Sequence, residues 1–264
     1  MIGRVLLAAI LAGIAAGLVT GVIQHVRVTP LILAAEQYEG MQAAPHDHAD
    51  APATGDTASV ATDPVAAAPA AAGHDHSKMT GDAAAAAGHE HDANAWMPQE
   101  GFERTFYSIL TRTLSAVGFA LMLAGLSYLA NIPITRGNGL IWGVCGFIAV
   151  SLAPAIGLPP VLPGVPEADI TMRQLWWGGT ILCTGLAIWL VVSQSQWQRY
   201  LIAAAFAIAP HVFGAPHIPP GNSPLPAALA SEFATISLGL SLVMWLLIGL
   251  FLAFTLNASK ENAA

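Results

Sequence analysis

The stretch VLLAAILAGIAAGLVTGVI, residues 5–23, contains no charged side chain and follows directly after Arg4. An α-helix of this length spans roughly 29 Å, which is close to the hydrocarbon thickness of a bilayer. The stretch therefore predicts a membrane-spanning helix. A cleaved signal peptide is the alternative. Its apolar region would exceed the usual length of about 7 to 15 residues, and no clean A-x-A site follows, so we expect a retained helix.

Further apolar runs follow, each flanked by charge, proline or glycine, and they predict additional spans. They are residues 114–130, 139–156, 176–193, 200–213 and 233–256. The 200–213 run is short and ends in a cluster of Pro and His, so it is either a crossing or a broken, re-entrant helix. The chain is 55% hydrophobic. The fold class predicted is all-α, a polytopic transmembrane helix bundle of five or six spans.

Charge and small residues add detail to this bundle. With six crossings, the basic residues Arg4, Arg136, Arg199 and Lys260 share one side, which the positive-inside rule makes cytoplasmic. Gly139 and Gly143 are spaced for close helix packing, and Pro154 should distort the third span near its end. The first span has a longer ridge of this kind, and another helix should approach it closely: Ala9, Gly13, Gly17 and Gly21.

Residues 43–95 contain no Leu, Ile, Phe, Tyr or Trp and cannot build a hydrophobic core. They predict a disordered, His-rich external loop between the first two spans. The chain should therefore divide into a first helix with a short extension (1–42), this tether (43–95) and the remaining bundle (96–264). The extension is predicted as a short amphipathic helix with Thr29 as its N-cap and Pro30 at its first position, running to about Tyr38.

Three copies of one tripeptide pattern lie in the tether, each with two histidines around a carboxylate. In an extended chain, side chains two residues apart point the same way, so each copy can offer two imidazoles to one transition-metal ion. Such binding should weaken below pH of about 6.5, where imidazole is protonated. Low-complexity sequence without function is the alternative. The predicted ligands are His46, His48, His74, His76, His89 and His91.

A second candidate set lies at the membrane boundary. His25 follows the first span, and taken alone it is better explained as a polar cap at the interface than as a metal ligand. His211 and His217 flank a Pro- and Gly-rich bend whose irregular backbone predicts a cavity-lining segment; two interfacial histidines in a stiff turn would have the same pattern. The Pro-rich segment LAPAIGLPPVLPG, residues 152–164, should lie on the same face, and the two loops together could cover one opening.

Several functions are excluded. The net charge of −7 argues against a nucleic-acid binder, because phosphate contacts need clustered Lys and Arg. The chain has no GxxxxGK[ST] loop for ATP, no HExxH zinc motif, and no recognisable pair of nucleophile and base. We therefore expect no enzymatic activity and no organic cofactor.

Motifs spread over nearly the whole chain resemble the CbtA family of probable cobalt transporter subunits. They are QHVRVTPLILAAEQYE (24–39), LAPAIGLPPVLPG (152–164), RQLWW (173–177) and APHVFGAPHIP (209–219). The resemblance implies a bacterial inner-membrane protein linked to cobalt supply for cobalamin, with its His-rich loop on the periplasmic side. It also implies a small single-span partner, CbtB. The pathway residues favoured by the resemblance are His25, Glu36, Glu39, His211 and His217.

We therefore expect a membrane subunit of a cobalt transporter, with cobalt as the transported substrate. Imidazole and carboxylate ligands would also accept nickel, zinc or copper. Two alternatives remain open: a membrane-tethered metal-binding or sensing protein, and a scaffold subunit whose glycine faces pack a partner helix while another protein conducts the ion.

Overall fold

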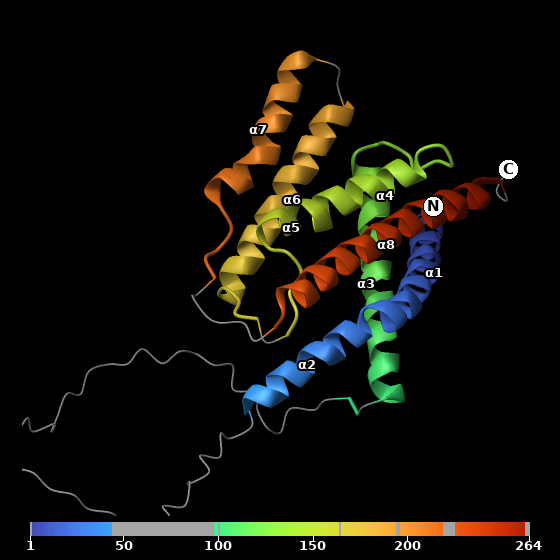
Figure 1. Cartoon of the computed structure of the whole chain (residues 1–264). Helices are drawn as coiled ribbons and strands as arrows, with labels where there is room; N and C mark the ends of the chain where they lie inside the picture. Colours follow the sequence, from blue (N-terminus) through green and yellow to red (C-terminus); the bar gives the residue numbers. More distant parts are fainter. Residues whose placement is uncertain are drawn as a thin grey trace, which may run out of the picture. The chain divides into compact units, whose positions relative to one another are not determined.

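The computed structural model describes residues 2–43, 98–99, 101–163, 165–193, 196–218 and 225–261, and all regular structure in these residues is helical (Figure 1). The side chains of residues 39–43 and 258–261 also lie outside the description, as does the predicted tether. The elements are α1 (Ile2–Arg27), α2 (Thr29–Ala43), α3 (Phe102–Leu129), α4 (Gly139–Phe147), the π-helix η1 (Ile148–Leu152), α5 (Ala153–Gly157), α6 (Ile170–Ser193), α7 (Trp197–Phe213) and α8 (Ala227–Glu261).

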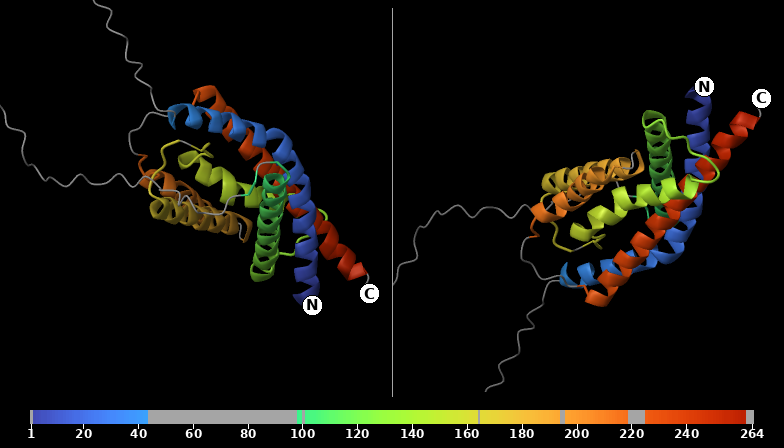
Figure 2. Two further views of the ribbon diagram at one scale, coloured as in Figure 1. Left: turned by 90° about the horizontal axis from the view of Figure 1, so that it is seen from below. Right: turned by 90° about the horizontal axis from the view of Figure 1, so that it is seen from above.

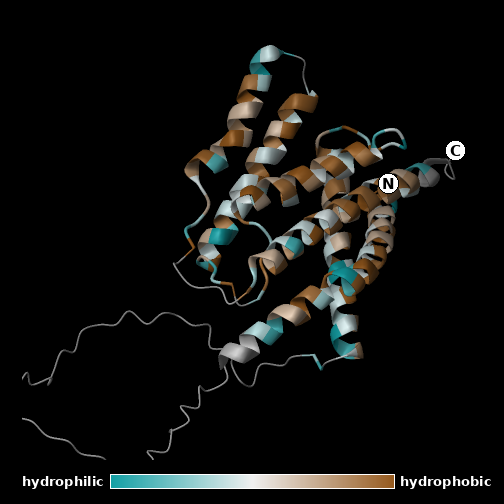
Figure 3. Ribbon diagram, in the orientation of Figure 1, coloured by the Kyte–Doolittle hydropathy of each residue, from teal (hydrophilic) through white to brown (hydrophobic). Residues whose placement is uncertain are grey.

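Five stretches are long and apolar enough to cross a membrane, and Figure 3 shows hydrophobic residues along them. The predicted all-α, multi-span fold is confirmed. The short 200–213 run forms α7, a helix of 17 residues that spans roughly 26 Å. The five stretches are Ile2–Arg27, Phe102–Leu129, Gly139–Gly157, Ile170–Ser193 and Ala227–Asn257.

α1 runs alongside α3 (Figure 2), and its glycines lie directly against α3, as the ridge in the sequence predicts. A Cβ atom added to Gly13 would lie 2.4 Å from the Val117 Cα, and one added to Gly17 would lie 2.4 Å from the Thr113 Cα. α3 itself begins at Phe102, twelve residues before the predicted span. The prediction missed this start because the first turns of α3 contain several polar residues. The small residues of α1 thus bring the two backbones into contact.

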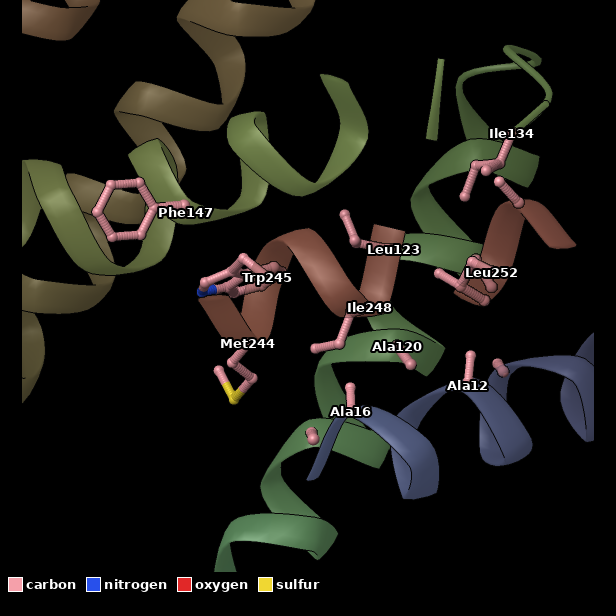
Figure 4. Close-up of a cluster of buried hydrophobic side chains, with 14 of the residues drawn as sticks. Ala12, Ala16, Ala120, Leu123, Ile134, Phe147, Met244, Trp245, Ile248 and Leu252 are labelled. Carbon is pink, nitrogen blue, oxygen red and sulfur yellow. The ribbon is translucent and has the colours of Figure 1, made fainter. Parts of the chain in front are cut away.

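A second close contact joins α4 to α8. A Cβ on Gly143 would lie 2.4 Å from the Trp245 carbonyl oxygen, and one on Gly249 would lie 2.1 Å from the Gly139 carbonyl oxygen. Trp245 is fully buried in the main hydrophobic core (Figure 4), where its ring packs on the Phe119 ring at a centroid distance of 4.8 Å. α8 is therefore the helix against which α1 and α4 both pack.

The third span changes from α-helix to π-helix over Ile148–Leu152, immediately before Pro154. Proline has no amide hydrogen and cannot donate to the carbonyl one turn earlier, so an α-helix is disfavoured at this point. The distortion predicted at Pro154 is thus found in the preceding turn. The Trp245 Nε1–H donates to the Ser151 Oγ at 3.2 Å and ties this turn to α8.

Two smaller contacts complete the fold. α2 begins at Thr29 and extends to Ala43, five residues beyond the predicted end, and its Ala35 is buried with Leu162 and Leu225 in a second small core. α7 packs along α6. The Trp176 Nε1–H, near the start of α6, donates to the Pro210 carbonyl oxygen in the last turn of α7 at 3.2 Å. α7 therefore returns the chain to the end at which α6 begins.

Candidate functional site

The predicted ligands near the end of α1 differ in their surroundings. His25 lies in the last turn of α1 with an exposed side chain. Glu36, on α2, forms an ion pair with Arg104 of α3, and the Arg104 Nη1–H donates to the Glu36 Oε2 at 3.2 Å. A metal ion at Glu36 would have to displace this guanidinium. Glu39 is within α2, but its side chain lies outside the description.

The predicted ligands at the end of α7 lie beside an aromatic ring. His211 is half-buried in the last turn, and its ring meets the Trp176 ring edge-on with centroids 6.0 Å apart. The helix stops at Gly214, which adopts a φ of 82° that favours glycine. His217 lies in the following segment with an exposed side chain.

The two Pro-rich loops meet, as expected from their predicted common face. Gly157 is the last residue of α5 and lies within the Pro-rich segment 152–164. A Cβ added to it would lie 2.5 Å from the Trp176 ring and 2.8 Å from the Ala215 Cβ. Trp176 thus sits between the end of the third span and the loop that carries His217. This tryptophan therefore helps to pack the two Pro-rich segments together.

Among the described residues, no group of three or more His, Cys, Asp or Glu side chains is placed to hold a metal ion. The predicted boundary ligands are not brought together into one such group. The paired histidines of the tether lie outside the described residues: His46, His48, His74, His76, His89 and His91. The predicted ligand set therefore stays a prediction.

A cavity of about 510 Å³ lies between the third span, the Pro-rich loop, α6 and α8. It begins among residues of the loop and reaches Ser241, which is roughly 21 Å along α8 from Ala227. Ser241 lies near the middle of the candidate span Ala227–Asn257, so the cavity includes a residue from the apolar part of α8. The polar side chains that line it are Ser151, Glu167, Arg173, Gln174 and Ser241.

The chemistry of this cavity is that of oxygen ligands. Glu167 forms an ion pair with Arg173, with side chains 39% and 31% exposed respectively. Ser151 accepts the hydrogen bond from Trp245 and keeps a second lone pair. Hydroxyl, carboxamide and carboxylate oxygens bind divalent transition-metal ions more weakly than thiolate or imidazole ligands do. Such a lining suits a cation in passage better than one held tightly, because conduction requires that the ion can leave.

Sequence reasoning missed Glu167 and Ser241. The acidic residue lies just after the Pro-rich segment that the sequence had singled out, so proximity to that loop was the available signal. Nothing in the sequence indicated that Ser241, on the last helix, would face the same cavity. That relation depends on how α4 and α8 pack.

The family model described as "Probable cobalt transporter subunit (CbtA)" matches residues 2–257, nearly the whole chain. No curated protein and no solved structure matches the chain.

Proposed function

The chain belongs to the CbtA family of probable cobalt transporter subunits, and from this premise we propose that it is the membrane subunit through which a cobalt ion enters the bacterial cell. The direction is uptake, and the metal supplies cobalamin synthesis. The protein lies in the inner membrane with its His-rich loop on the periplasmic side. A small single-span CbtB-like protein is its partner.

The cavity beneath the Pro-rich loop carries this proposal. It combines a carboxylate near the loops with half-buried hydroxyl groups on membrane-spanning stretches, and polar residues in spanning segments that face a cavity are candidates for a substrate pathway. In the proposed path, Glu167 binds the ion first, and the hydroxyl groups of Ser151 and Ser241 bind it further inward.

The predicted histidines act before this cavity. His211 contacts Trp176, and the neighbouring Trp177 lines the cavity, so the α7 end and the cavity share the first turns of α6. We assign His211 and His217 to capture of the ion at this end. The histidines of the tether collect cobalt when it is scarce, and flexible, individually weak sites suit that role.

The test is uptake of radioactive cobalt into vesicles that contain the purified chain, with and without the single-span partner. We expect uptake that requires the chain and increases with the partner. His211→Ala and His217→Ala should abolish uptake at every cobalt concentration, whereas deletion of residues 43–95 should lower it only at scarce cobalt.

The opposite pattern favours the alternative of a tethered metal sensor. In that case deletion of residues 43–95 alone would abolish cobalt accumulation, and the two histidine variants would accumulate the metal normally. If the partner alone took up cobalt, this chain would instead be identified as a scaffold subunit.

A further inference from the structure

The third span contains a turn in which two backbone carbonyls lose their usual hydrogen-bond donors. In the π-helix η1, the Ala153 N–H donates to the Ile148 carbonyl oxygen, five residues earlier. In an α-helix this amide would donate to the Ala149 carbonyl oxygen instead. The next amide along the chain would serve Val150, but Pro154 stands there and has no N–H. The carbonyls of Ala149 and Val150 therefore both lose the amide that an α-helix would give them.

These two carbonyls belong to buried residues of a membrane-spanning stretch. Ala149 is 8% exposed and Val150 is 7% exposed, and both lie within the candidate span Gly139–Gly157. A buried carbonyl without a donor is costly, and irregular backbone at membrane depth is tolerated where protein buries it or where it lines a cavity. Val150 lines the cavity of about 510 Å³, as do Ser151 and Pro154. Of the two carbonyls, that of Val150 is therefore the candidate for a ligand in the cavity.

Two hydroxyl groups converge on the same turn. The Ser151 Oγ accepts the Trp245 Nε1–H at 3.2 Å, which ties Ser151 to α8. Ser241 lies four residues before Trp245, and residues at this spacing share one face of a helix. Ser241 also lines the cavity. The hydroxyl groups of the third span and of α8 thus meet in one cavity beside the Val150 carbonyl.

The three groups are neutral oxygen donors, and this chemistry selects the charge of the occupant. Carbonyl and hydroxyl oxygens can replace the water around a cation, whereas an anion would meet the negative ends of their dipoles. An apolar molecule would leave the carbonyl without a partner. In membrane transporters, carbonyls of unwound helices coordinate cations, and single π-turns are frequent at functional sites. The η1 turn therefore suits a cation.

We propose that the η1 turn is a cation-binding site within the transport path, with the Val150 carbonyl and the hydroxyl groups of Ser151 and Ser241 as its ligands. Pro154 is its positioning residue, because the missing amide keeps the carbonyl open to the ion. The inference rests on the proposed function for the identity of the ion, which is cobalt. It adds a backbone ligand to that path and gives the proline a role in transport.

Pro154→Ala tests the role of the missing amide. The new N–H should occupy the Val150 carbonyl and return the turn to α-helix, which stabilises the helix but removes a ligand from the ion. We expect a higher apparent Tm in detergent together with a KM for cobalt uptake into vesicles raised by about fivefold, the equivalent of one hydrogen bond. Opposite effects on stability and uptake would not arise from a proline with a structural role alone.

Pro163→Ala is the matched control. Pro163 belongs to the same Pro-rich segment, but it is exposed and is not among the residues that line the cavity. This variant should leave the KM for cobalt unchanged. An equal KM shift in the two variants would overturn the proposal, because the stiffness of the whole segment would then explain both.

A thiolate placed at the turn gives a direct signature of a bound metal. In a chain with Cys145 and Cys183 replaced by alanine, Ser151→Cys puts a soft sulfur ligand where we place the ion. Cobalt added to this purified variant should produce an intense near-ultraviolet charge-transfer band, and so should cobalt added to Ser241→Cys. The histidines of the tether give no thiolate band, so the readout is specific to the turn. Ser231→Cys, exposed on the same helix as Ser241, should give no band.

Failure of this inference differs from failure of the proposed function. If the wild-type chain takes up cobalt and Pro154→Ala leaves the KM unchanged, or if Ser151→Cys gives no band, the proposal is overturned and the carbonyl is satisfied by water alone. If the wild-type chain takes up no cobalt but Ser151→Cys still gives the band, the binding site stands and the proposed function fails.

Discussion

At the scale of single residues, the notable feature is that two described carboxylates, those of Glu36 and Glu167, each form an ion pair with an arginine. Glu36 pairs with Arg104, and Glu167 pairs with Arg173. A free carboxylate beside a membrane opening would attract any cation and hold divalent ions longest. The paired guanidinium lowers that attraction, so in the proposed pathway an arriving ion would have to displace it. Neutralised carboxylates thus favour passage over capture.

This exchange can be measured at the Pro-rich loop. Arg173→Gln should lower the KM for cobalt uptake, and Glu167→Gln should raise it. We expect changes of about two- to fivefold, because a half-exposed ion pair contributes up to about 1 kcal/mol. Both effects should shrink at high salt, which screens the carboxylate. Uptake by reconstituted vesicles over a range of cobalt concentrations gives the KM.

Asp169→Asn is the control for that experiment. Asp169 is two residues from Glu167, and its Oδ1 accepts a hydrogen bond from the Met172 amide at 3.0 Å at the start of α6. Asparagine also serves in this capping position, so the variant removes a nearby charge without altering the ion pair. A KM shift equal to that of Glu167→Gln would mean that only the general charge of the loop matters.

At the scale of helices, glycine decides which elements touch. The four-residue spacing in α1 and the pair Gly139 and Gly143 predicted close packing, and both were confirmed. The partners could not be predicted, because spacing describes one surface and not the surface it meets. The start of α3 was placed too late for a related reason. Its first turns contain polar residues such as Arg104, which usually flank a membrane span. Only the structure shows that Arg104 instead belongs to the helix and contacts α2.

α8 provides a direct test of the packing argument. Gly249→Ala should destabilise the protein by about 1–3 kcal/mol, because the new methyl group would overlap the Gly139 carbonyl oxygen. Gly239→Ala lies on the same helix, where a Cβ meets nothing within 4 Å, and should be neutral or slightly stabilising. The apparent Tm in detergent, followed by tryptophan fluorescence, compares the two. Equal Tm values would contradict the close contact.

At the scale of the whole molecule, the sequence predicted the helical bundle but not the cavity between the third span, α6 and α8. The thickness of the bilayer sets the length of an apolar run, so spanning helices can be predicted from the sequence alone. The cavity instead requires the π-helix, the Pro-rich loop and Ser241 of α8 to converge, and Ser241 is ninety residues from Ser151. The boundary histidines were chosen for their chemistry, and the described structure does not gather them.

The path of the chain through the membrane is open to a labelling experiment. The contact between Trp176 and Pro210 requires α7 to return toward the start of α6. In a chain with Cys145 and Cys183 replaced by alanine, single cysteines at Pro159 and Ile218 should react with an impermeant maleimide in intact cells. Those at Gly137 and Gln196 should react only after permeabilisation. Labelling of Gln196 together with Ile218 would show that α7 does not cross.

The shortness of α7 has a consequence for the surrounding lipid. Its 17 residues leave it roughly 4 Å short of an average hydrocarbon layer, whereas α6 beside it has 24 residues. Acyl chains next to α7 must therefore compress or splay, at a cost of fractions of a kcal/mol per Å. An α7 that crosses the membrane would thin the bilayer at this hairpin, and the thinning would shorten the apolar barrier near His211.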